Sequence, residues 1–178
     1  LSDETSPDLP AGATEDWLAA VKDDIEMRQW GVRPFDDSKP AEINASYWAP
    51  NAIHNLKTYF TDTGIEVRSN RATDNHDWRF AMSLGGVGSP ESMVAAGSAV
   101  QVIDGMRVEY QRGNVTEWYV NDNKGLEQGF TITAPPANVT DELVLALDID
   151  SDMGARVISN DLVTLSQGDG QTDLYLRN

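Results

Sequence analysis

The first regular pattern of apolar and polar residues along this chain has the period of an α-helix. Four apolar side chains fall on one stripe at helical spacing, namely Trp17, Leu18, Val21 and Ile25. Thr14 is suited to cap the first turn, and Gly31 is suited to stop the helix. The pattern predicts one amphipathic helix over residues 14–29, with Trp17 at the head of its stripe as an anchor in the core.

Beyond Pro40 the pattern changes to short alternating runs separated by turn residues roughly every 8 to 12 positions. Asp104 and Gly105 form the strongest hairpin turn, and residues 61–64 form another. One strand is expected to bury the face that carries Trp78, Phe80, Met82 and Leu84. About ten or eleven strands result. They are predicted at residues 56–60, 65–68, 78–84, 100–103, 106–111, 115–120, 130–133, 143–149, 155–158, 162–165 and 174–177. The predicted fold class is therefore all-β, an antiparallel β-sandwich preceded by the one amphipathic helix.

The chain of 178 residues has the length of one domain with a short arm. Residues 1–12 carry little apolar surface and two prolines, so they are expected to form a flexible N-terminal arm. Residues 13–178 are expected to form a single sandwich domain that includes the helix. The last predicted strand runs to Asn178 without a following turn, so either this strand is expected to dock at a sheet edge or the native polypeptide is expected to continue into further modules.

Composition removes several classes of function. The formal net charge is −16, and a field of that sign repels nucleic acid and anionic membrane surfaces. The chain has no cysteine, which excludes disulfides, cysteine-bound metals and thiol nucleophiles. No apolar run approaches the roughly 20 residues that a membrane-spanning helix needs. A polar start at Leu1 is typical of a mature chain whose export signal has been removed.

Candidate catalytic groups are few. His54 and His76 are the only histidines, and neither lies in the spacing of a metal-binding or hydrolase motif. Glu117 and Glu127 form the best pair of carboxylates for a glycosidase, because aromatic residues that could stack on a sugar ring lie beside them. The alternative, which we favour, places Glu117 on the solvent face of a strand. In that alternative Glu127 and Gln128 stabilise a bulge over residues 125–129.

Three acids spaced two residues apart resemble the start of a calcium-binding loop, namely Asp148, Asp150 and Asp152. Such loops turn alternating oxygens inward around a hard cation. The match is imperfect, because Met153 stands where a glycine belongs and the next strand supplies no glutamate. The alternative is a solvated acidic hairpin tip. Calcium is the one cofactor that the sequence suggests.

Exposed aromatics suggest carbohydrate as a second class of ligand, since flat rings stack on sugar faces. Most aromatics of a β-sandwich are expected in its core. Trp118 and Tyr119 are adjacent, so they must point to opposite faces of a strand. The candidate binding residues are Trp30, Tyr47 and Trp48, which are expected in loops, together with Trp118.

Two stretches of the sequence carry motifs that are more distinctive than the alternation expected of any β-strand. One spans residues 49–60, and the other spans residues 117–130 and includes Trp118, Tyr119 and Phe130. With residues 17–29 and 108–112, they resemble the N-terminal β-rich domain of exported bacterial proteins that carry FG-GAP or SBBP-type repeats. The resemblance implies a secreted or surface β module placed before repeat domains, with no known ligand and no catalytic residue. Residues 148–152 have no counterpart in that resemblance.

The function expected from the sequence is non-catalytic. It is that of an extracellular or surface-associated module acting in protein–protein assembly, adhesion or scaffolding. One alternative is a carbohydrate-binding module that uses the exposed aromatics, and another is a glycosidase-type hydrolase that uses Glu117 and Glu127. The expected partners are another protein or a second copy, with a polysaccharide as the alternative and no nucleic acid. The expected location is extracellular, at the cell surface or in the periplasm.

Overall fold

The fold is described here from a computed structural model, which covers residues 13–35, 43–70, 78–134, 136, 139, 142–168 and 172–177. The predicted N-terminal arm and His76 lie outside these residues. One helix, α1 (Glu15–Trp30), precedes the strands, and the Thr14 side chain caps it by accepting a hydrogen bond from the main-chain N–H of Trp17. All described strand pairs are antiparallel. The prediction of an all-β fold with one N-terminal helix is confirmed.

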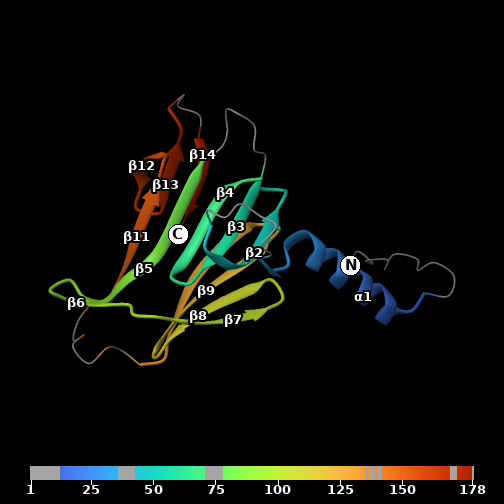
Figure 1. The fold of residues 1–178 in the computed structure, drawn as a ribbon, viewed down its shortest axis with the longest axis horizontal. Coiled ribbons are helices and arrows are strands. Elements are labelled where there is room, and N and C mark those ends of the chain that lie inside the picture. Colours follow the sequence, from blue (N-terminus) through green and yellow to red (C-terminus); the bar gives the residue numbers. More distant parts are fainter. Residues whose placement is uncertain are drawn as a thin grey trace, which may run out of the picture.

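The largest sheet has seven strands, and we call it the large sheet (Figure 1). Its order is β1-β2-β3-β4-β5-β11, and β6 pairs with the last part of β5, residues 86–89, beyond the part that pairs with β4. Its strands are β1 (Arg33–Pro34), β2 (Ala45–Asn51), β3 (Leu56–Thr61), β4 (Gly64–Ser69), β5 (Arg79–Ser89), β6 (Ser92–Ala95) and β11 (Val144–Ser151). β11 is therefore an edge strand of the large sheet. Along the sequence, the four strands of the next sheet lie between β5 and β11.

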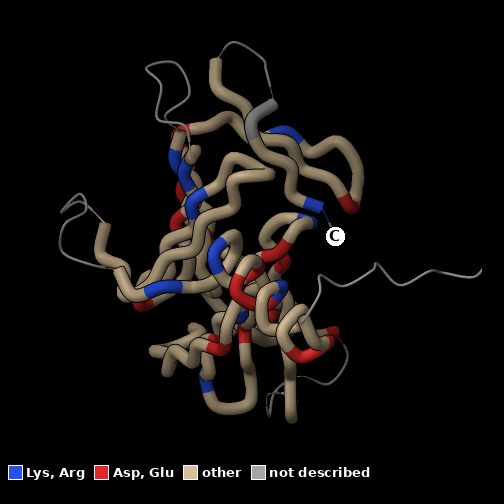
Figure 2. Tube along the Cα trace, turned by 90° about the vertical axis from the view of Figure 1, so that its right-hand side faces the viewer, with Lys and Arg blue, Asp and Glu red and all other residues tan. Residues whose placement is uncertain are grey.

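Two smaller sheets complete the described fold. The four-stranded sheet has the order β10-β9-β8-β7, with β7 (Val100–Asp104), β8 (Arg107–Arg112), β9 (Val115–Asp122) and β10 (Gly125–Ile132). The three-stranded sheet has the order β12-β13-β14, with β12 (Gly154–Ser159), β13 (Leu162–Ser166) and β14 (Thr172–Arg177). Acidic and basic positions are spread over several elements of the fold (Figure 2).

The core lies between the large sheet and the two smaller sheets. Phe60 and Phe80 of the large sheet meet Val108, Tyr110 and Tyr119 of the four-stranded sheet, and all five side chains are buried. The ring of Tyr119 makes edge contacts with those of Phe60, at 6.1 Å, and Tyr110, at 6.0 Å. The face predicted from the alternation at residues 78–84 is confirmed, because all four of its apolar side chains are buried.

The helix forms where it was predicted, but the prediction that it buries an apolar face is wrong. No residue of α1 is buried, and Trp17, which was expected to anchor the core, is 50% exposed. In Figure 1 the helix projects from one side of the sandwich. Its attachment is at the C-terminal end, where Arg33 donates to the carbonyl of Arg28 and Asn121 donates to the carbonyl of Trp30. Of the four residues of the predicted stripe, Leu18 and Val21 are half-buried, while Trp17 and Ile25 are exposed.

The structure has three strands that the sequence did not predict, namely β1, β2 and β6. It also corrects the interpretation of residues 125–129. They were expected to form a bulge, but β10 begins at Gly125 and pairs with β9 without a shift of register from Gly125 to Ile132. Gly125 has a φ of 129°, which suits the tight turn that it closes.

Candidate functional site

A continuous row of side chains crosses the outer face of the large sheet, and we call it the outer row. Cross-strand neighbours in an antiparallel sheet share a face, so the strand register defines the row. From β1 to β11 the row consists of Arg33, Trp48, Tyr59, Glu66, Ala81 and Asp150. Its sequence neighbours on β3, β4 and β5 point into the core, which places the row on the opposite face of the sheet, where Tyr59 and Glu66 are nevertheless buried.

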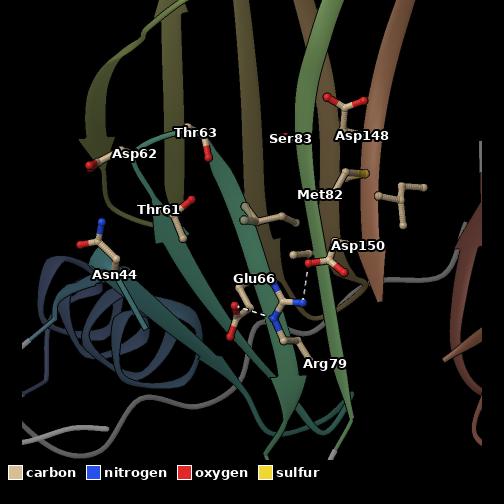
Figure 3. Close-up of a pocket in the computed structure, with 13 residues that line it drawn as sticks. Asn44, Thr61, Asp62, Thr63, Glu66, Arg79, Met82, Ser83, Asp148 and Asp150 are labelled. Carbon is tan, nitrogen blue, oxygen red and sulfur yellow. Dashed lines mark hydrogen bonds and ion pairs between the residues drawn. The ribbon is translucent and has the colours of Figure 1, made fainter. Parts of the chain in front are cut away.

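Ion pairs link the acidic half of the outer row. Glu66 accepts from Arg68 at 2.7 Å and from Arg79 at 2.9 Å, and Arg79 also contacts Asp150 at 2.8 Å (Figure 3). The hydrogen bonds to Asp150 and Glu66 raise the pKa of the Arg79 guanidinium above its ordinary value. Burial raises the pKa of Tyr59, the next residue in the row, although the charge of Arg68 opposes this shift. These linked ion pairs hold four side chains in place across three strands, namely Glu66 and Arg68 of β4, Arg79 of β5 and Asp150 of β11.

A shallow groove of about 480 Å³ lies beside these ion pairs. Four carboxylates line it, from Asp62, Glu66, Asp148 and Asp150, and Arg79 is the one basic side chain among its lining residues. Thr61, Thr63 and Ser83 add hydroxyl groups (Figure 3). The lining contains no histidine and no cysteine. The groove therefore offers acceptors for cationic or hydroxyl-bearing groups, but no nucleophile paired with a histidine base.

The aromatic residues predicted to bind a ligand do not form one platform. Tyr47 and Trp48 lie on β2 rather than in a loop, and Tyr47 packs against the core while Trp48 belongs to the outer row. Trp30 is the last residue of α1, so its expected position in a loop is also wrong. Trp118 lies on the outer face of the four-stranded sheet, on the other side of the core. A sugar chain could not stack on Trp48 and Trp118 together.

Trp118 is held between two neighbours. A Cβ atom at Gly129 would lie 2.1 Å from Cζ2 of the Trp118 ring, so the ring occupies the space above that glycine. The guanidinium of Arg107 lies over the ring, 4.5 Å from its centre, and pairs with Glu109 at 2.8 Å. The hydrogen bond from Arg107 lowers the pKa of Glu109. The prediction that Trp118 and Tyr119 point to opposite faces is confirmed, since Tyr119 is fully buried.

The three acids proposed for calcium have separate surroundings. Asp150 pairs with Arg79, and Asp152 accepts a hydrogen bond from the main-chain N–H of Arg79 at 2.9 Å. The Asp148 carboxylate lies over Gly85, where an added Cβ would be 2.4 Å from Oδ2. No group of three histidine, cysteine or acidic side chains able to hold a metal occurs among the described residues. The physical reason is that Asp148 and Asp150 lie on the extended strand β11, so they do not curl around one point with Asp152, which follows the strand.

Glu117 was expected on the solvent face of its strand, and this expectation is wrong. Its side chain is fully buried and pairs with Arg112 at 2.8 Å, and its other oxygen accepts from Tyr119 at 2.6 Å and from Gln128 at 2.9 Å. Gln128 therefore supports Glu117 rather than a bulge. Burial, together with the Glu117 charge, raises the pKa of the Tyr119 hydroxyl far above its ordinary value. We call Arg112, Glu117, Tyr119 and Gln128 the buried polar network.

The two carboxylates suggested for a glycosidase lie on opposite faces of the four-stranded sheet. Glu117 faces the core, while Glu127 is opposite Val120 on the outer face of the four-stranded sheet and is exposed. Carboxylates on opposite faces cannot act on one bond between them. His54 lies in the turn after β2, where its Nε2 contacts the carbonyl of Asn123 at 2.9 Å. Neither arrangement assembles a catalytic group among the described residues.

Comparison with known proteins identifies no relative. No protein-family model, no curated protein and no solved structure matches the chain. The resemblance to the N-terminal domain of repeat-bearing exported proteins therefore stays a prediction.

Sequence reasoning missed Glu66, Arg68 and Arg79, which fix the acidic end of the outer row. The available signal was the strand parity of residues 64–69, in which Glu66 and Arg68 alternate with the apolar Ile65 and Val67. That parity predicts a shared outer face for the two charged side chains. It does not predict their partner on β5, because that contact depends on the register between β4 and β5.

Proposed function

We propose that this chain is a non-catalytic, extracellular or surface-associated module that acts in assembly, adhesion or scaffolding by binding another protein. The single observation that carries the proposal is the exposure of two large apolar side chains, Trp17 and Ile25, on one side of α1. Export is part of the proposal because the resemblance to exported bacterial proteins implies it. No described helix is long and apolar enough to cross a bilayer.

The stripe on α1 has the spacing of a helix that docks into a groove. Trp17, Val21 and Ile25 lie one turn apart on one side, and Trp17 and Ile25 are 50% and 47% exposed. Most helices in proteins are stabilised by the packing of an apolar face rather than by the propensity of their own residues. A 16-residue helix without a buried residue therefore gains stability from a partner that covers this face.

The two alternatives receive less support from the geometry. A carbohydrate-binding module needs an aromatic platform, and the four proposed residues are divided among a helix end, two faces of β2 and the opposite sheet. A glycosidase needs two carboxylates beside one cleft, and Glu117 and Glu127 are separated by the four-stranded sheet. Protein binding requires neither arrangement.

Site-specific photo-crosslinking tests the proposal. A photo-reactive amino acid replaces Ile25 in one variant and Asp23, which is exposed on the opposite side of α1, in the matched control. After mixing with the extracellular proteins of the source organism and irradiation, we expect one discrete adduct from position 25 and at least tenfold less from position 23. Excess unlabelled protein should suppress the adduct, and the Trp17→Ala variant should compete more weakly.

The same preparation separates protein binding from carbohydrate binding. Tryptophan fluorescence is followed during titration with a panel of polysaccharides. We expect no saturable change. Saturable quenching that Trp48→Ala abolishes, together with equal crosslinking from positions 23 and 25, would replace the protein-binding proposal with the carbohydrate one.

Calcium at Asp148, Asp150 and Asp152 stays a prediction that the separate surroundings of these acids do not favour. A ligand that binds only the folded state raises its stability, so removal of a bound calcium ion would lower the midpoint of thermal unfolding. We expect the midpoint to be unchanged when a chelator replaces added calcium. A lower midpoint with chelator that the Asp148→Asn variant does not show would establish the site.

A further inference from the structure

The outer edge of the large sheet at β11 has no strand beside it in the described fold. β11 pairs with β5 from Val144 to Ser151, and no other strand pairs with it among the described residues. An edge strand presents a row of main-chain N–H and C=O groups that a further strand can pair with. Proteins use such edges to bind extended segments, with affinity from main-chain hydrogen bonds and specificity from alternate side chains.

One face of this edge is apolar and uncovered. Leu147 is opposite Leu84 and Ile149 is opposite Met82, so both point to the core side of the large sheet. Leu84 and Met82 are buried, but Leu147 and Ile149 are 36% and 54% exposed. The smaller sheets cover the core side of β5 and leave these two side chains of β11 accessible. A segment paired with β11 would extend this apolar face.

The other face of the same edge is acidic. Asp148 and Asp150 are opposite Ser83 and Ala81 on the outer face, and both are exposed. Arg79 pairs with Asp150, while the Asp148 carboxylate lies over Gly85 beside the groove. Acids on an edge strand repel a second acidic strand, and the whole chain carries a net charge of −16. The occupant favoured by this charge is therefore basic, and a second copy of the chain is disfavoured.

We propose that β11 binds an extended segment of a partner protein by strand addition, and that this segment alternates basic with apolar residues. Its basic side chains lie beside Asp148 and Asp150, and its apolar side chains lie beside Leu147 and Ile149. Opposite charges on neighbouring strands favour this register, and a shift by one residue would place each basic side chain against the apolar face. This proposal rests on the proposed function only in assuming that the chain binds another protein. It does not depend on the role proposed for α1.

Synthetic peptides of the length of β11 test this inference by fluorescence anisotropy. The probe alternates lysine with valine. One control has the same composition with the lysines and valines in separate blocks, a second has glutamate in place of lysine, and a third carries N-methyl groups on alternate main-chain nitrogens. We expect the probe to bind and each control to bind at least tenfold more weakly. The N-methylated control keeps the charge and removes the strand hydrogen bonds.

Two charge-reversal variants locate the binding. Asp148→Lys is expected to weaken binding of the probe at least tenfold, while Asp23→Lys on the exposed surface of α1 makes the same charge change and should alter it less than twofold. Ile149→Asp is a second variant at the edge with the same expected loss. Hydrogen exchange should slow in β11 when the probe is added.

Equal binding of the N-methylated control, or equal weakening by Asp23→Lys and Asp148→Lys, would show attraction by charge alone and overturn the inference. Absence of probe binding at millimolar concentration would also overturn it. Trp17→Ala should leave peptide binding unchanged. Crosslinking from α1 and peptide binding at β11 are measured separately. A negative result in the peptide experiment therefore does not affect the crosslinking result, and a negative crosslinking result does not affect the peptide result.

Discussion

Replacement of Arg112 with alanine is expected to lower the free energy of unfolding by about 3–5 kcal/mol, because it leaves a buried charge without its partner. The side chain of Arg112 is 4% exposed and that of Glu117 is 0% exposed. Arg112 also donates to the carbonyl of Thr63 at 3.0 Å and lies over the ring of Tyr110. Urea unfolding followed by circular dichroism and tryptophan fluorescence measures the loss.

An exposed ion pair is the matched control. Arg28 and Asp24 of α1 have the same contact distance, 2.8 Å, but their side chains are 77% and 58% exposed. Arg28→Ala should therefore cost less than about 0.5 kcal/mol. Adding Glu117→Gln to Arg112→Ala removes the stranded charge and should recover part of the loss. A loss below about 1 kcal/mol for Arg112→Ala alone would contradict the role given to the buried pair.

The second large effect is expected at Asn121, which connects α1 to the sandwich. Its amide donates to the carbonyls of Trp30 and Pro50, both at 2.8 Å, and its oxygen accepts from Asn51 at 2.9 Å. Asn121→Ala removes these three hydrogen bonds from a buried position, although Asn51 keeps its bond to the carbonyl of Asp122, so it should cost about 2–4 kcal/mol. Hydrogen exchange should become faster in the last turn of α1, since the bond to Trp30 is lost.

Asn123→Ala is the control for this variant, because Asn123 is exposed in the turn between β9 and β10. Its replacement should change the free energy of unfolding by less than about 0.5 kcal/mol. The role of Asn121 would be refuted if its variant matched that of Asn123 and left exchange in α1 unaltered.

Features that depend on neighbouring residues were predictable from the sequence. The alternation at residues 78–84 defined the buried face of β5, and Asp104 with Gly105 defined the turn between β7 and β8. The helix was also predicted within one or two residues, because its cap and its periodic stripe are local. Whether the stripe is covered depends on the rest of the fold, so the expected burial of Trp17 was wrong.

Features that depend on register were not predictable. β2 contains Pro50 and has no clean alternation, and it forms because β1 and β3 pair with its two edges. Burial of Glu117 requires Arg112 on the neighbouring strand, and a carboxylate alone is expected outside. The groove gathers residues from positions 44 to 150, and the pairing of β4, β5 and β11 brings them together.

The connection between β5 and β11 has a consequence for folding. The strands β7 to β10 form a meander of sequential hairpins, and the whole meander is inserted between these two neighbours of the large sheet. Hairpins form from local contacts, whereas β11 must close a long loop before it reaches β5. β11 is therefore expected to join late and to detach early, as the least cooperative strand of its sheet. A partner segment that pairs with the free edge of β11 would convert β11, the last strand to fold, from an edge strand into an interior strand of the sheet.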